Sequence, residues 1–232
     1  MKQVLQKNSL FIALSLILIA VLGLAMMIIP KGELHLLLCD RHTPALDAFY
    51  RWYTTIAEWF PYLVCVCILL FGCIGDGVFA TSAMILSALT TQLCKHIVRA
   101  PRPLSWFDAN MPDVSLPIVD GVQMNYWNSF PSGHTTSFFA LAFVLCIICT
   151  GLPRYSKEPM RAKNRIESAT IQIFLFLMAA LGGYSRIYLS QHFAADVFAG
   201  VVVGVLITTI CYVVFCRYKD QKWYKYRVFE KK

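Results

Sequence analysis

The sequence predicts an all-α integral membrane protein, a polytopic bundle of six transmembrane helices with one amphipathic helix at the membrane interface. Of its 232 residues, 58% have hydrophobic side chains and only 15% are charged, more apolar than a water-soluble core of this size requires. The apolar residues form long runs separated by charged or turn-forming segments. We expect residues 1–232 to form a single integral-membrane domain.

The first apolar run, residues 8–30, is uncharged and follows Lys2 and Lys7. It is longer than the core of a signal peptide and lacks a small-residue cleavage site, so we expect a retained first span. Residues 33–60 are mixed in character. Thr43 and Pro44 favour a helix start, and apolar residues then recur every three or four positions. This pattern predicts a helix in the membrane interface or, equally, one packed over the mouth of the bundle.

Five further spans follow in the sequence. The second, residues 61–74, ends at a Gly-Asp-Gly turn at residues 75–77, and the third, residues 78–97, is stopped by Pro101 and Pro103. Residues 104–130 form a loop that is long for a helical bundle, which favours a segment that covers or shapes a site. The fourth, fifth and sixth spans are expected at residues 133–152, 168–184 and 194–216, with a basic loop at residues 154–165.

The distribution of basic residues predicts the orientation. Six spans place both ends of the chain on one side, and that side carries two basic residues before the first span, five in the loop and seven after residue 216. The other side carries the remaining seven of the 21 lysines and arginines, so both termini are expected in the cytoplasm. The net charge of +8 therefore reflects membrane topology, and we expect no nucleic-acid partner.

The nine cysteines do not predict a disulfide framework. Eight of them lie in or beside apolar runs, where a thiol acts as a small hydrophobic group, and only Cys39 lies plainly outside. The aspartates of the long loop lack nearby histidines, so no metal site and no cofactor are expected.

Residues 185–196 place an arginine, a histidine and an aspartate directly before the last apolar run. Ionisable groups at the end of a membrane span are costly and seldom accidental. If a helix begins at His192, then Asp196 lies one turn further on the same face and can hold one imidazole nitrogen. Arg186, in or near the preceding loop, offers a rigid fork of donors for a phosphate or carboxylate.

The predicted topology brings other polar residues to the same outer side. Lys95 and Arg102 flank the end of the third span, where each alone is most simply explained as a snorkelling cation. Ser132 can cap the fourth span, and the backbone N–H groups from Ser132 to His134 can then meet an anion. Taken alone, a capping serine and an interfacial histidine also have this simpler explanation.

Together these residues resemble the three motifs of the type 2 phosphatidic acid phosphatase (PAP2) superfamily, which shares its site with vanadium haloperoxidases and bacterial acid phosphatases. All three match in order and at full spacing: Lys95 with Arg102 and Pro103; Pro131, Ser132, Gly133 and His134; and Ser185 and Arg186 with His192 and Asp196. The resemblance covers residues 95–196 and implies a PAP2/haloperoxidase-like helical core.

The resemblance also implies a role for each residue. His192 is expected to be the nucleophile that forms a phosphohistidine, and Asp196 to orient it. His134 is expected to protonate the leaving oxygen and then to activate water. The remaining candidates are expected to hold the non-bridging phosphate oxygens: Lys95, Arg102, Ser132, Gly133 and Arg186. Three cations and a helix N-terminus suit phosphoryl transfer without a metal.

The expected substrate is therefore a phosphate monoester or diphosphate on a membrane lipid, hydrolysed at the outer, periplasmic face of a bacterial inner membrane. A general resemblance to bacterial lipid A phosphatases favours lipid A, at its 1- or 4′-phosphate. Undecaprenyl diphosphate and phosphatidylglycerol phosphate remain alternatives, since the motifs recognise the phosphate and not the alcohol. A non-catalytic protein that binds anionic lipid is a remote alternative, because both histidines are present.

Overall fold

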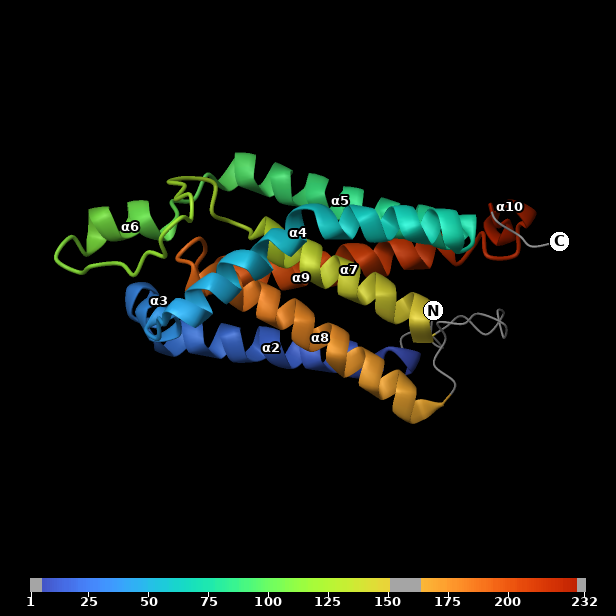
Figure 1. Cartoon of the computed structure of the whole chain (residues 1–232), viewed down its shortest axis with the longest axis horizontal. Coiled ribbons are helices and arrows are strands. Elements are labelled where there is room, and N and C mark those ends of the chain that lie inside the picture. The colour runs from blue at the N-terminus through green and yellow to red at the C-terminus, as the bar shows by residue number, and fades with distance from the viewer. Residues whose placement is uncertain (1–5, 151–163, 229–232) are drawn as a thin grey trace.

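The computed structural model describes residues 6–150 and 164–228, and every regular element in this part of the chain is helical. Six of its helices are long and apolar enough to cross a membrane, as predicted. They lie side by side in one elongated bundle (Figure 1). Their bounds are α2 (Ser9–Ile28), α4 (Pro44–Phe71), α5 (Ile74–Val98), α7 (Gly133–Thr150), α8 (Arg165–Tyr188) and α9 (Ala194–Phe215).

Helix α7 forms the centre of the bundle. Of its span, 67% is buried inside the protein, against 11% for α2 at the periphery. It packs against α4, α5, α8 and α9. Glycines allow the close approach on the α9 side, because a Cβ at Gly200 would lie 2.8 Å from the Cβ of Thr135 and 2.9 Å from the carbonyl oxygen of Ser132. This contact places the start of α9 directly against the start of α7.

The two ends of the bundle differ. The short helices α3 (Lys31–Cys39) and α6 (Pro103–Asn110) lie at one end together with residues 111–132, whereas α10 (Lys222–Lys225) lies at the opposite end with the beginning of α2 (Figure 1). Both α3 and α6 begin beside a proline, at Pro30 and Pro103. Helix α6 occupies the start of the segment predicted to be a loop, and α3 was not predicted.

The predicted break at Pro61 is wrong. The amphipathic stretch and the second span form the single 28-residue helix α4, which contains Pro61 in its interior. Proline removes one backbone hydrogen bond, but membrane helices tolerate this loss where neighbouring helices pack around it. Pro61 lies on the buried face with Ala57 and Cys65, one turn to either side. The beginning of α4 follows the prediction, since Thr43 accepts a hydrogen bond from the Leu46 amide at 3.2 Å.

Two local predictions are also corrected. The predicted turn residues 75–77 lie in the first turn of helix α5, and the chain reverses just before them, at Gly72 and Cys73. Gly77 instead allows close packing of α5 on α4, because a Cβ at this position would lie 2.5 Å from Leu69. Cys39 is buried, although its sequence context suggested a position outside the core. All nine cysteines are free. Most of the predicted basic loop lies outside the described residues.

Candidate active site

Five helix ends meet at the end of the bundle that holds α3 and α6. Lys95 lies in the last turn of α5, Arg102 immediately precedes α6, and Arg186 lies in the last turn of α8. His134 lies in the first turn of α7 and Asp196 in the first turn of α9. Electrostatic interactions link Lys95 with Arg102, Arg186 and Asp196, and link His134 with His192. The structure thus brings the predicted site residues together.

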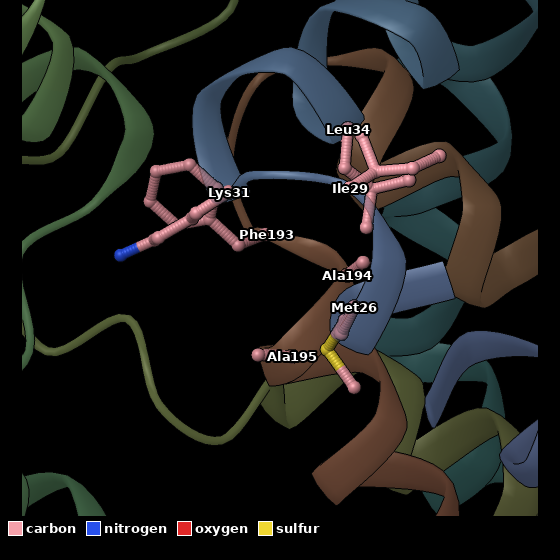
Figure 2. Close-up of a pocket in the computed structure, with 7 residues that line it drawn as sticks. All are labelled: Met26, Ile29, Lys31, Leu34, Phe193, Ala194 and Ala195. Carbon is pink, nitrogen blue, oxygen red and sulfur yellow. The ribbon is translucent and has the colours of Figure 1, made fainter. Parts of the chain in front are cut away.

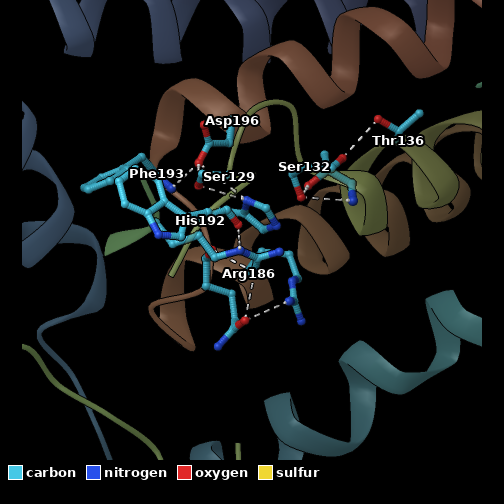
Figure 3. Close-up of polar contacts among 11 residues, drawn as sticks. Ser129, Ser132, Thr136, Arg186, His192, Phe193 and Asp196 are labelled. Carbon is cyan, nitrogen blue, oxygen red and sulfur yellow. Dashed lines mark hydrogen bonds and ion pairs between the residues drawn. The ribbon is translucent and has the colours of Figure 1, made fainter. Parts of the chain in front are cut away.

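His192 lies in the turn between α8 and α9. Helix α9 starts at Ala194, the predicted start of the sixth span, so His192 itself lies just outside the helix. The predicted contact nevertheless forms, with His192 Nδ1 at 3.4 Å from Asp196 Oδ2. The same carboxylate oxygen accepts hydrogen bonds from the Phe193 amide at 2.9 Å and from the Ser129 hydroxyl at 2.5 Å (Figure 3). Asp196 therefore fixes both the turn and the imidazole.

Ser129 is a site residue that the sequence analysis missed. Its hydroxyl donates to Asp196 and lies 3.4 Å from His192 Nδ1, so it joins the histidine and the aspartate. Ser129 is fully buried and comes from the segment before α7. Its place in the sequence, three residues before Ser132, was the only available indication of this role.

Burial sets the charge of His192. Its side chain is 1% exposed, and desolvation lowers the pKa of the imidazole to about 3, against the opposing effect of Asp196. The nearby Arg102 and Arg186 lower this pKa further. The imidazole is therefore neutral near pH 7. Because Nδ1 faces Asp196 and Ser129, Nε2 is the nitrogen that can act as a nucleophile.

Two arginines share one acceptor, which the sequence analysis also missed. Arg102 Nη1 donates to the side-chain oxygen of Gln191 at 3.0 Å, and Arg186 Nη2 donates to the same oxygen at 3.5 Å. Gln191 is 2% exposed, and its amide nitrogen donates in turn to the carbonyl oxygen of Gln123 at 3.3 Å. A neutral carboxamide thus lies between two like charges and joins them to the long loop.

The remaining contacts of the two guanidinium groups come from other elements. Arg186 Nη1 donates to the Thr54 hydroxyl of α4 at 2.6 Å, while Arg186 Nε is buried without a hydrogen-bond partner among the described residues. Arg102 Nε donates to the carbonyl oxygen of Trp127 at 3.1 Å. Since an unpaired buried donor is costly, the Arg186 fork is suited to bind a further acceptor such as a phosphate oxygen.

The start of α7 provides fewer free amides than predicted. The Ser132 N–H donates to the carbonyl oxygen of Asp196 at 2.9 Å, which leaves the amides of Gly133 and His134 as those without an intrahelical acceptor. The Ser132 hydroxyl accepts from Thr135 Oγ1 at 2.9 Å, so its own proton can still be donated. Lys95 Nζ lies 3.9 Å from the position of a Cβ on Gly133. This ammonium therefore lies beside the helix N-terminus.

His134 occupies the open side of the site. Its side chain is 26% exposed, and its Nε2 lies 3.4 Å from Glu58 Oε1, on a carboxylate that is 61% exposed. Glu58, on α4, was not among the predicted residues.

In the described parts of the chain, no group of three or more His, Cys, Asp or Glu side chains is arranged to hold a metal ion. The site therefore combines a buried histidine, a more accessible histidine and three cations.

Comparison with protein families identifies a match over most of the helical core. The PAP2 superfamily model matches residues 76–220, a range that contains every residue of the predicted site. The match begins in the first turn of α5 and ends after α9.

Known proteins with similar sequences include phosphatases from plants and bacteria. The chain is 30% identical over 145 residues to lipid phosphate phosphatase 2 of Arabidopsis thaliana, covering 57% of this chain and 48% of that protein. It is 26% identical over 189 residues to the lipid A 4′-phosphatase of Porphyromonas gingivalis, covering 78% and 70% respectively. The chain thus spans about half the length of the plant relative, but more of the bacterial one.

A solved structure has a similar arrangement of helices. LpxE from Aquifex aeolicus superimposes with a TM-score of 0.56 at 25% identity, covering 78% of this chain and 93% of that one. The similarity therefore extends over nearly the whole of the other fold.

Proposed function

The chain belongs to the PAP2 superfamily, and on this premise we propose that it is a lipid phosphatase that uses no metal. The observation that carries the proposal is the environment of His192: a buried, neutral imidazole that Asp196 and Ser129 hold beside the guanidinium groups of Arg102 and Arg186. Such a group is prepared to attack phosphorus while the cations bind the charged oxygens.

The reaction proceeds in two displacements. His192 Nε2 forms a bond to phosphorus as the bond from phosphorus to the lipid oxygen breaks, and His134 donates a proton to that oxygen. His134 then takes a proton from water, which attacks the phosphohistidine and releases phosphate, so that both histidines return to their starting states. Asp196 stabilises the imidazolium that forms. Five groups hold the non-bridging oxygens: Lys95, Arg102, Arg186, the Ser132 hydroxyl and the Gly133 amide.

The proposed substrate is a phosphorylated membrane lipid, with lipid A as the first choice. Its hydrocarbon chains stay in the bilayer while the phosphate enters the end of the bundle. The similarity to the lipid A 4′-phosphatase of P. gingivalis supports this choice. Undecaprenyl diphosphate and phosphatidylglycerol phosphate remain alternatives, because the motif residues are proposed to recognise the phosphate and not the alcohol.

We also propose that the site faces the periplasm, across a bacterial inner membrane. The end of the bundle opposite the site contains α10 and the beginning of α2 (Figure 1). The residues assigned to that side include fourteen of the 21 lysines and arginines, which is typical of a cytoplasmic face. Both chain termini would then be cytoplasmic.

Phosphate release by the purified protein tests this function. The assay uses detergent and EDTA, with lipid A, undecaprenyl diphosphate and phosphatidylglycerol phosphate as substrates. The wild type should release phosphate from at least one lipid, His192→Ala should not, and His96→Ala, an exposed histidine on α5, should match the wild type. A folded wild type that hydrolyses none of these lipids would contradict the proposal and favour a binding role.

A further inference from the structure

A small apolar pocket lies beside the candidate active site, where the end of α2 and the start of α3 meet the start of α9 (Figure 2). Its volume is about 160 Å³. Six of the lining side chains are apolar: Met26, Ile29, Leu34, Phe193, Ala194 and Ala195. The seventh, Lys31, is the only charged one. We refer to these seven residues as the α2–α9 pocket.

The outer wall of this pocket belongs to the helix that is most open to lipid. Only 11% of the α2 span is buried, the lowest share among the six candidate spans of the described chain. Met27 and Ile28, beside the pocket, are 86% and 70% exposed. A hydrocarbon chain in the bilayer can therefore reach the pocket without crossing a polar surface.

The inner wall belongs to the active site. Phe193 follows His192 directly, and its amide donates to the carboxylate of Asp196 at 2.9 Å. Phe193, which lines the pocket, is therefore the residue next to the proposed nucleophile in the chain. The α2–α9 pocket and the phosphate site share this segment of backbone, so a single molecule can occupy both.

Lys31 lies at the rim of the pocket and interacts electrostatically with Asp196 of the candidate active site. Its ammonium is 3.9 Å from the centroid of the Phe193 ring and 5.1 Å from that of Trp106, a cation–π arrangement. Burial lowers the pKa of Lys31, while the nearby Asp196 raises it. This pairing of a cation with an apolar pocket matches a ligand that carries a negative head group and an aliphatic tail.

We propose that the α2–α9 pocket binds the first methylenes of an acyl chain of the substrate lipid, and that Lys31 contacts the anionic head group of the same molecule. This inference rests on the proposed function. An apolar cavity of about 150 Å³ holds one benzene molecule, so the pocket fits a short stretch of chain and not its full length. The rest of the chain extends along the exposed face of α2.

Photochemical labelling tests the occupant independently of turnover. The probe is a phosphatidic acid with a diazirine in its acyl chain near the glycerol, in nanodiscs that contain the full chain. Adducts should appear on residues 26–34 and 193–195 and should decrease when lipid A is added. In Ala195→Leu, whose larger side chain fills the pocket, these adducts should be lost, whereas Ala195→Ser, a control that adds only one small atom, should retain them.

Kinetics provide the second measurement. Ala195→Leu should lower kcat/KM about tenfold on the preferred lipid, the loss expected when two buried methylenes are displaced. Lys31→Gln should raise KM with little change in kcat, and Lys222→Gln, an exposed lysine at the other end of the bundle, should match the wild type. Lys31→Gln leaves the apolar pocket intact, so it tests the proposed contact between Lys31 and the head group even if Ala195→Leu fails to fold.

The outcomes separate the two proposals. If the wild type hydrolyses lipid but the adducts lie only on the outer face of α2 and do not change in Ala195→Leu, the pocket proposal is overturned and the proposed function stands. If the pocket is labelled as predicted but no lipid is hydrolysed, the proposed function is overturned. The acyl chain in the pocket would then belong to a bound lipid that is not a substrate.

Discussion

The two histidines of the site occupy contrasting environments. His192 is 1% exposed, contacts Asp196 and Ser129, and lies next to two arginines. His134 is 26% exposed, and its ring nitrogen lies 3.4 Å from Glu58, itself an exposed residue. The imidazole of His192 is thus held in place and shielded from solvent, whereas that of His134 is accessible to water.

This difference supports the two chemical roles that we propose. A nucleophile needs a fixed position and an uncharged nitrogen, which burial and the Asp196 contact provide. An acid and base must exchange protons with the leaving group and then with water, which requires access to solvent. The comparison leads to five predictions, from the largest expected effect to the smallest.

Removing the buried histidine should have the largest effect. In His192→Ala no nitrogen can accept the phosphoryl group, so we expect the rate of phosphate release to fall by more than about 10⁴-fold. Stopped assays on the best lipid measure this rate. A variant that keeps a tenth of the wild-type activity would exclude His192 as the nucleophile.

Removing the exposed histidine should have a smaller effect. We expect His134→Ala to lose about 10² to 10⁴ in rate, the typical contribution of a general acid or base. The first step alone, measured as the burst of p-nitrophenol released from p-nitrophenyl phosphate, should be slowed much less, because this leaving group needs no proton. A burst slowed as much as lipid hydrolysis would contradict the assignment of His134 as the acid.

Removing the shared acceptor of the arginines should weaken phosphate binding. Gln191→Leu deprives Arg102 and Arg186 of the oxygen to which both donate, at 3.0 and 3.5 Å. We expect a loss in kcat/KM of about tenfold to a hundredfold, mainly through KM, because one charge-assisted hydrogen bond contributes about 1.5 to 3 kcal/mol. Gln92→Leu, an exposed glutamine on α5, serves as the control. An unchanged KM would show that Gln191 does not position the arginines.

The burial of His192 should make the protein less stable in acid. Its folded-state pKa, about 3, lies below the ordinary value of 6.5, so the unfolded chain binds a proton first as the pH falls. Stability due to the neutral imidazole is therefore present above pH 6.5 and is lost progressively toward pH 3. Thermal unfolding in detergent across this pH range should show that the stability of His192→Gln falls less with decreasing pH than the stability of the wild type. The same pH dependence for both proteins would contradict this account.

The smallest effect should come from the carboxylate beside the open histidine. Glu58 is 61% exposed and lies 3.4 Å from His134, so solvent screens the pair. We expect Glu58→Gln to change kcat/KM by less than about fivefold, corresponding to at most about 1 kcal/mol. A loss comparable to that of His134→Ala would show that Glu58 belongs to the proton path.

The sequence predicted the spans and the motif residues because each depends on a local pattern. Long apolar runs predict the membrane helices, and fixed spacing identified His192 and Asp196 before any geometry was known. The predicted helix boundaries were less accurate where the local preference of a residue competes with the packing of the helices. Pro61 predicts a break in isolation, but the packed face of α4 accommodates it.

Ser129 and Gln191 could not be predicted in the same way. Each acts through contacts between segments far apart in the chain: Ser129 with Asp196, and Gln191 with Arg102. Polar residues of these types are common in loops, and no spacing rule separates these two from their neighbours. Only the three-dimensional arrangement gives them a role.

The most direct test of the account is the identity of the phosphorylated residue. His134→Ala is incubated with ³²P-labelled p-nitrophenyl phosphate and quenched in alkali, where phosphohistidine is stable, and the labelled peptide is identified. The account predicts label on the peptide that contains His192, and none in the double variant that also carries His192→Ala. Label on any other residue, or turnover without a labelled intermediate, would contradict the assignment of the buried histidine as the nucleophile.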